Sequence, residues 1–222
     1  MKPLTQHDIE EFNNKIYDIY KNETTIIVDG IIDVDSYNSS NKKILWILKE
    51  PYGEDAFNYS KYIKGFQFGK SFPTSGAMWA KITYVNYGIL NNYQMWNEFK
   101  TLYEDEDVFK ALKNCALINL KKIPGKTRSD NNEIMNSYKL YKDLVHEQIS
   151  FINPIIVICG GTFRLLDYPF EKANSINGKN LIGYKYDNKI FIDAYHPSYF
   201  IKKQEEYCDE IITMCRNFIQ NI

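Results

Sequence analysis

Two short segments of the chain each place an ionisable side chain next to a proline, directly after a run of apolar residues. Glu50 lies in segment 49–53 (KEPYG), which follows the apolar run 44–48, and His196 lies in segment 195–198 (YHPS). In open α/β sheets, ligands bind outside the carboxyl ends of the strands. A carboxylate and an imidazole at one such edge could act as an acid/base pair or could stabilise charge that develops on a substrate.

Two more apolar runs end in polar or glycine residues. Asn119 lies between Ile118 and Leu120, and two glycines precede Thr162. A buried amide needs hydrogen-bond partners, so Asn119 is either a satisfied core amide or a reader of a base edge, to which it offers a donor and an acceptor. The glycine turn suits an anion site at a helix start, and it suits a tight strand-to-helix turn equally well.

Glu50 and His196 each have a structural interpretation too. Glu50 suits a solvated turn or an ion pair with Lys49, and His196 suits a turn in which the following serine caps the last helix. The four strand ends together indicate a site more strongly than any one of them does.

The pattern of apolar residues predicts the elements that position these side chains. Continuous apolar runs indicate strands buried on both faces, and helical spacing indicates amphipathic helices. We expect strands at 44–48, 115–120, 155–159 and 189–194, the last paired with 181–186 in a hairpin, and helices at 7–22, 75–100, 104–113, 131–151 and 200–220. The segments 36–41, 52–74 and 121–130 are expected to be irregular connections.

This alternation of strands and helices predicts an α/β fold. We expect one domain over residues 1–222, with an N-terminal helix and extension at 1–41 and a core at 42–222. The core would hold a central, mainly parallel, four-stranded sheet with helices on both faces. A chain of 222 residues is long enough for one such domain.

Composition argues against several classes of protein. The formal net charge is −1, so no global positive field favours a polyanion, although pairs of basic residues recur near strand ends. No stretch approaches the roughly 20 apolar residues of a membrane helix, and the polar start of the chain lacks a signal core. The four cysteines form no CxxC pair, which argues against zinc or iron–sulfur ligation. We therefore expect a cytoplasmic monomer without metal or other cofactor, with its cysteines as buried free thiols.

The order of these motifs resembles that of the uracil-DNA glycosylase superfamily. Segment 49–52 (KEPY) is similar to the first motif of that family, of which QDPY is one version, and segment 194–198 (AYHPS) is similar to its second motif. The resemblance spans roughly residues 43–200, and only these short motifs and their spacing are specific. It implies a uracil-DNA glycosylase-like fold and a monofunctional DNA glycosylase, acting on DNA in repair or in defence against modified foreign DNA.

The resemblance also implies roles for individual residues. Glu50 would position or activate water beneath the sugar, and His196 would donate a hydrogen bond to the base O2 as negative charge builds there. The base would be bound by Lys49, Tyr52, Phe72 and Asn119, with Tyr52 beside the pyrimidine C5 and with Phe57, Phe66 and Phe68 as alternatives to Phe72 for stacking. Phosphates would be contacted by Lys126, Arg128, Ser129, Thr162 and Ser198, and an apolar wedge would consist of Tyr199, Phe200 and Ile201.

Departures from the family motifs point to a divergent member. Leu48 and Lys49 replace a common glycine and a glutamine-like donor, glutamate replaces aspartate at position 50, and the iron–sulfur cysteines of one branch are absent. The aromatic segment 52–74 would rim a wide pocket, so we expect either uracil or a bulkier, modified pyrimidine as the substrate. Two alternatives stay open: an enzyme that cleaves the N-glycosidic bond of free nucleotides with Glu50 as nucleophile, and a non-catalytic nucleic-acid-binding module of the same fold.

Overall fold

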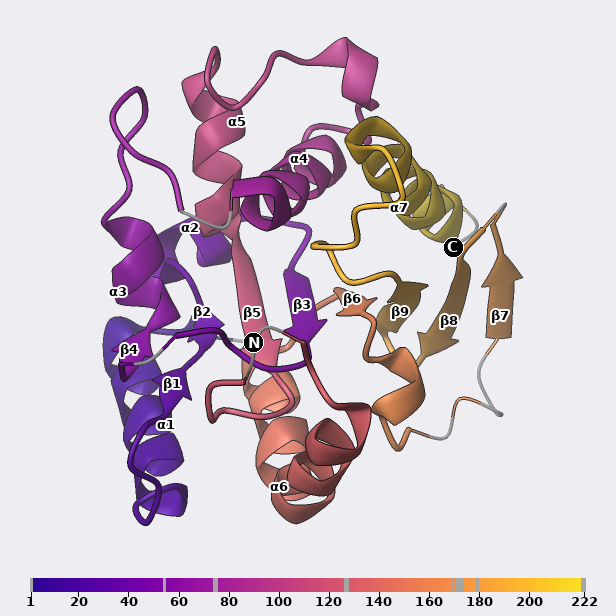
Figure 1. Ribbon diagram of the computed structural model, residues 1–222. Helices are drawn as coiled ribbons and strands as arrows, with labels where there is room; N and C mark the ends of the chain where they lie inside the picture. The colour runs from indigo at the N-terminus through magenta and orange to yellow at the C-terminus, as the bar shows by residue number, and fades with distance from the viewer. Residues whose placement is uncertain are drawn as a thin grey trace.

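Four parallel strands form the centre of the sheet in the computed structural model, which describes residues 2–53, 55–73, 76–125, 128–168, 170, 174–178 and 180–220. They are neighbours in the order β5 (Cys115–Asn119), β3 (Ile44–Leu48), β6 (Ile156–Gly160) and β9 (Lys189–Ala194) (Figure 1). Every residue of β3, β5 and β6 is buried, as expected for strands that are covered on both faces. The predicted parallel core is therefore confirmed.

The whole sheet is larger and more mixed than the four strands that we predicted. Among the described residues it contains seven strands, in the order β2-β5-β3-β6-β9-β8-β7. At one edge β2 (Gly30–Ile31) is antiparallel to β5, and at the other edge β8 (Ile182–Tyr186) and β7 (Asn174–Asn177) add two antiparallel strands. The hairpin of β8 and β9 was expected, but β2 and β7 are too short to show an alternating pattern. A separate parallel pair consists of β1 (Ile27–Val28) and β4 (Phe57–Asn58).

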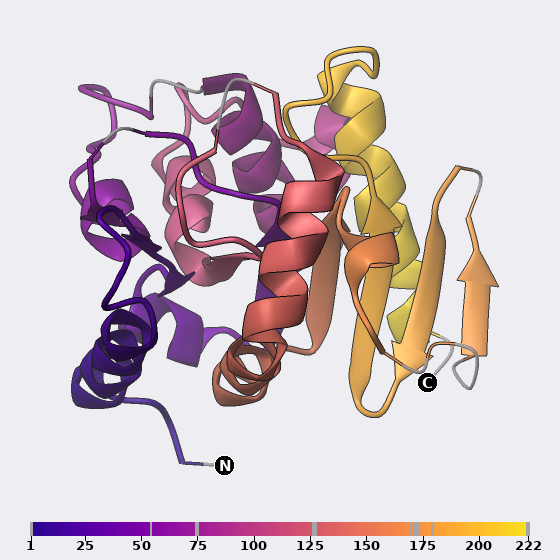
Figure 2. The same cartoon turned by 60° about the horizontal axis from the view of Figure 1, so that its bottom comes forward.

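Helices cover both faces of this sheet (Figure 1; Figure 2). One face packs against α4 (Gly76–Leu90) and α7 (Gln204–Gln220), with the shorter α3 (Tyr59–Lys64) and α5 (Glu106–Lys110), and the other face packs against α6 (Asn131–Ile152). The side chains of β3 alternate between these two cores, so that Trp46 belongs to the α4 and α7 side and Ile47 belongs to the α6 side. The first helix, α1 (Gln6–Ile19), contributes Ile9 to the α6 side. No helix within the described ranges is long and apolar enough to cross a membrane.

Two segments that we expected to be irregular contain short helices. The helix α2 (Val34–Ser39) overlaps the predicted connection 36–41 and is capped by the preceding Asp33, whose side chain accepts a hydrogen bond from the Ser36 N–H at 2.9 Å. The helix α3 lies inside the predicted loop 52–74 and is capped in the same way by Asn58. Helices of six residues depend on caps and tertiary packing, so periodicity does not reveal them.

The longer predicted helices are present with shifted bounds. The segment 75–100 divides into α4 and a 3-10 turn, η1 (Trp96–Glu98), and the segment 104–113 divides into α5 and η2 (Ala111–Asn114). A further 3-10 turn, η3 (Phe163–Leu165), follows β6, and α7 begins four residues later than expected, at Gln204. None of these shifts moves a strand end, and the strand ends carry the candidate site.

Candidate functional site

A pocket of about 580 Å³ lies at the carboxyl ends of β3, β6 and β9. Its lining includes Lys49, Gly161 and His196, each from just beyond one of these strands, together with Arg164, Asp193 and Tyr199. This volume falls within the range of pockets that hold small molecules. The structure therefore brings two of the predicted site residues, Lys49 and His196, to one concave surface.

Gly161 lies between Lys49 and His196 in a backbone conformation that favours glycine. Its φ of +70° is in the left-handed region, and a Cβ at this position would lie 3.5 Å from Cε of Lys49 and 3.6 Å from Cβ of His196. Its N–H donates to the Ala194 carbonyl at 2.7 Å. The close packing is at Gly160, where a Cβ would lie 2.6 Å from Cδ2 of Leu48 and 3.0 Å from Cδ of Pro197, so the glycine turn serves both backbone conformation and packing at the strand ends.

His196 is held as a neutral hydrogen-bond donor. Its Nδ1 accepts a hydrogen bond from the Ser198 N–H at 3.2 Å, and the Ser198 hydroxyl lies 2.7 Å from the same atom. Burial, reinforced by the charges of Lys49 and Lys81, lowers the pKa of His196 to about 4. A neutral imidazole whose Nδ1 accepts carries its proton on Nε2. At pH 7 the Nε2–H group can therefore donate to a carbonyl oxygen or to a developing anion.

The connection that follows His196 carries an exposed apolar tip. Tyr195 and Tyr199 stack with their ring centroids 4.6 Å apart and their planes 9° from parallel. Phe200 and Ile201 project beyond this stack and are 89% and 70% exposed. Since Tyr199 also lines the pocket, the exposed tip begins beside the pocket.

Glu50 is enclosed and lies outside the lining of the pocket. Its side chain is 5% exposed, and its Oε2 accepts a bond from Nζ of Lys121 at 2.9 Å. The segment 121–125 covers the carboxylate so closely that a Cβ at Gly125 would lie 1.9 Å from Cδ of Glu50. Backbone bonds hold this cover in place, from Gly125 N to Pro51 O at 2.9 Å and from Lys121 N to Lys49 O at 3.0 Å. The ion-pair interpretation of Glu50 is thus correct in kind, but the partner is Lys121 and not Lys49.

Lys121 bridges two carboxylates. Its Nζ lies 3.4 Å from Glu133 at the start of α6, in addition to its bond with Glu50. Burial alone would lower the pKa of Lys121, but hydrogen bonds and ion pairs with Glu50 and Glu133 outweigh this effect and raise it. Lys121 is therefore a cation at neutral pH, and it balances the charge of Glu50.

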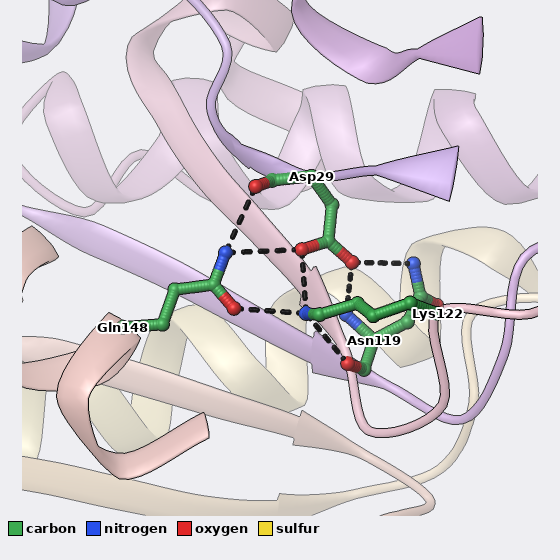
Figure 3. Close-up of polar contacts among 4 residues, drawn as sticks. All are labelled: Asp29, Asn119, Lys122 and Gln148. Carbon is green, nitrogen blue, oxygen red and sulfur yellow. Dashed lines mark hydrogen bonds and ion pairs between the residues drawn. The ribbon is translucent and has the colours of Figure 1, made fainter. Parts of the chain in front are cut away.

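Asn119 belongs to a buried polar network of four residues (Figure 3). Its backbone N–H and its Nδ2 both donate to Oδ2 of Asp29, at 2.7 and 3.2 Å. Lys122 donates from Nζ to Oδ1 of Asp29 at 2.6 Å, to the Asn119 carbonyl at 2.9 Å and to Oε1 of Gln148 at 2.8 Å. Gln148 donates in turn to the carbonyl oxygen and Oδ1 of Asp29. The core-amide interpretation of Asn119 therefore has direct geometric support. Oδ1 of the Asn119 side chain is buried without a hydrogen bond of good geometry.

The sequence carries signals for this network, although the periodicity of apolar residues does not reveal it. Asp29 interrupts the apolar run from Ile26 to Ile32, and Gln148 lies on the helix face that also carries Leu144 and Ile152. An isolated polar residue on an apolar face needs a buried partner. Such signals predict that partners exist, but they do not identify Lys122 as the partner.

The two aromatic residues expected at the base lie apart from the pocket lining. Tyr52 is 70% exposed. Phe72 packs against the core, with its ring centroid 5.9 Å from that of Phe109 and 6.2 Å from that of Tyr103. In this structure the aromatic residues that line the pocket are instead Phe163, Tyr195 and Tyr199.

The residues expected at DNA phosphates differ in accessibility. Thr162 is fully buried and its hydroxyl donates to the Ile47 carbonyl at 2.8 Å, so this side chain serves the interior and is not presented to a phosphate. Arg128 is exposed, Ser129 is half-buried, and Ser198 is exposed beside His196. Lys126 lies outside the described residues.

The four cysteines are buried free thiols, as predicted. Burial raises the pKa of Cys115 to about 12, which keeps that thiol protonated and unreactive at neutral pH. Within the described part of the chain, no group of three or more metal-ligating side chains lies close enough together to hold an ion.

The sequence matches no protein-family model and no curated protein.

Proposed function

We propose that the protein is a DNA glycosylase that flips a pyrimidine out of DNA and hydrolyses its N-glycosidic bond. The neutral His196 on the pocket at the strand ends is the observation that carries this proposal. Cleavage of the bond leaves negative charge on the departing base and positive charge on the sugar. A fixed, uncharged N–H donor near the base oxygen stabilises the negative charge on the departing base without the energetic cost of burying another cation.

The apolar tip supports the same proposal. Extruding a base from a duplex costs a few kcal/mol of stacking and pairing, which proteins offset by inserting apolar side chains into the gap. Phe200 and Ile201 are exposed beside the pocket, where they are free to enter such a gap. A pocket of about 580 Å³ suits uracil or a bulkier, modified pyrimidine.

In this proposal Glu50 stabilises the developing positive charge on the sugar or orients the attacking water. The side chain is enclosed by segment 121–125, so this role requires residues 123–125 to move when DNA binds, while Lys122 keeps its place in the buried network. The required opening breaks the bond from Gly125 N to Pro51 O and exposes the Glu50–Lys121 pair.

The proposal is tested by incubating the protein with DNA strands that contain uracil or a panel of modified pyrimidines, and by identifying the released bases by mass spectrometry. Release of at least one base is the expected result. Binding to oligonucleotides should also weaken steeply as salt rises, because contacts to phosphates release counterions. A salt-insensitive protein that cleaves only free nucleotides would contradict the proposal for DNA.

A second candidate function is a non-catalytic nucleic-acid-binding module. The observation in its favour is the enclosed Glu50, whose carboxylate is neutralised by Lys121 and lies outside the lining of the pocket. Salt-sensitive DNA binding with no released base from any substrate would support this second candidate over the first.

Replacing His196 with alanine should slow base release by about 10²–10³-fold, because the departing base loses its hydrogen-bond donor. The measurement is the single-turnover rate on whichever substrate the wild type cleaves. His7→Ala is a suitable control, because His7 is exposed on α1 and its side chain is 3.8 Å from Glu11 rather than near the pocket. Equal rates for wild type and His196→Ala would remove His196 from the mechanism.

Replacing Phe200 with alanine should weaken activity on duplex DNA much more than activity on single strands, because only the duplex requires a base to be unstacked. Rates on matched single- and double-stranded substrates measure this difference. Leu140→Ala is the matched control, since Leu140 is an apolar residue on α6 whose side chain is likewise strongly exposed, at 73%. A loss of the same size on both substrates would contradict a wedge.

A further inference from the structure

The turn that carries His196 is held at both ends by side chains from α4 and α7, the helices that pack on one face of the sheet. The Tyr207 hydroxyl, on α7, donates to the Tyr195 carbonyl at 2.8 Å, directly before His196. Nζ of Lys81, on α4, donates to the Tyr199 carbonyl at 2.6 Å, three residues after His196. The two side chains also contact each other, with Nζ of Lys81 lying 4.8 Å from the centre of the Tyr207 ring.

Lys81 is an unusual residue for this position. It is 5% exposed, and in the part of the chain that the structure describes its contacts are with a carbonyl and an aromatic ring rather than with a carboxylate. Burial lowers the pKa of Lys81, which reflects the cost of keeping a cation there. A methionine would fill similar space without that cost, so the charge calls for an explanation beyond packing.

We infer that Lys81 and Tyr207 are positioning residues for His196, which they act on through the turn 195–199. This inference rests on the proposed function of His196. Lys81 and Tyr207 together form a clamp, which fixes the carbonyls of Tyr199 and Tyr195 on either side of His196. The clamp thereby fixes the direction of the imidazole ring. It also sets the start of the apolar tip, because the Tyr199 carbonyl immediately precedes Phe200.

The charge of Lys81 has a second effect at the same site. Burial is the main cause of the lowered pKa of His196, and the positive charges of Lys49 and then Lys81 add to it. Arg164 and Asp193 are the other charged residues that line the pocket with His196. Lys81 thus helps to keep the imidazole uncharged, as a neutral donor requires.

The test compares Lys81→Met with the wild type by two independent readouts. The first is the pKa of His196 followed by NMR, which should rise from about 4 when the charge is removed. The second is the single-turnover rate of base release, which should fall by roughly 10²-fold because the histidine is no longer held in place. Lys81→Arg keeps the charge and should preserve the low pKa of His196.

Three further variants separate the clamp from general stability. Lys42→Met is a close chemical match, since Lys42 donates to the Ile89 carbonyl at 2.6 Å and lies 4.1 Å from the Tyr93 ring. Lys42 precedes the amino end of β3, whereas the candidate site lies at the carboxyl ends of the strands. Lys42→Met should change neither readout. Tyr207→Phe removes only the hydroxyl and should slow base release while leaving the pKa of His196 low. Lys81→Gln keeps a donor for the Tyr199 carbonyl, and it takes over the pKa measurement if Lys81→Met does not fold.

A wild-type protein that releases no base contradicts the proposed function, whereas the NMR measurement still decides whether Lys81 controls the protonation of His196. An unchanged pKa in both Lys81→Met and Lys81→Gln overturns the electrostatic role. Unchanged rates in Lys81→Met and Tyr207→Phe overturn the clamp.

Discussion

Replacing Glu50 with glutamine should reduce base release by about 10²–10⁴-fold and leave DNA binding almost unchanged. Glutamine keeps the size of the side chain, but it provides neither a negative charge for the sugar nor a base for the attacking water. Single-turnover rates and binding to a substrate oligonucleotide measure the two properties separately.

The control for this variant is Glu133→Gln. It also deprives Lys121 of a carboxylate partner, at 3.4 Å, but it leaves Glu50 intact. Equal losses in the two variants would assign the effect to Lys121 rather than to Glu50. Undiminished activity of Glu50→Gln would exclude Glu50 from the chemistry and favour a site built only from the residues around His196.

Replacing Lys122 with methionine should lower the free energy of unfolding by about 3–5 kcal/mol, because it leaves the Asp29 carboxylate buried without a counter-charge. Both side chains of this ion pair are 0% exposed, and the pair joins the region between β1 and β2 to the end of β5. Urea-induced unfolding monitored by circular dichroism provides the measurement. The double variant Asp29→Asn with Lys122→Met removes both charges and should recover part of the loss.

The matched control for Lys122 is Lys15→Met. Lys15 also pairs with a carboxylate, that of Glu147, but these side chains are 46% and 48% exposed. Exposed ion pairs add little to stability because water screens the charges and the side chains lose entropy when they pair. If Lys122→Met cost no more than Lys15→Met, the buried network would not be a determinant of stability.

Much of the fold and part of the site can be predicted from local sequence alone. The run from Ile44 to Leu48 is apolar at every position, as is typical of a strand whose side chains are buried on both faces of the sheet. The same pattern places Lys49 and His196 at one edge of the sheet, where the structure shows them on one pocket. These features follow from the spacing of apolar residues and from the direction of parallel strands.

The environment of each side chain could not be predicted in this way, because its partners are far away in the sequence. Asn119 binds Asp29 across 90 residues, and Glu50 is paired with Lys121 across 71 residues. A strand-end motif looks the same whether its carboxylate is open to solvent or covered by another loop. Thr162 illustrates the point, since its position after a glycine turn suggested a phosphate contact while its hydroxyl is bound to Ile47 across 115 residues.

The sequence by itself therefore determined the parallel core and the set of polar residues at its carboxyl edge, since both depend on local periodicity and on strand direction. Only the tertiary structure decided which of those residues face the pocket and in which charge state. His196 is neutral because burial and two lysines from other elements disfavour its protonation, and Glu50 is enclosed because segment 121–125 packs over it. Charge state and access depend on desolvation and on distant partners, and these exist only once the chain has folded.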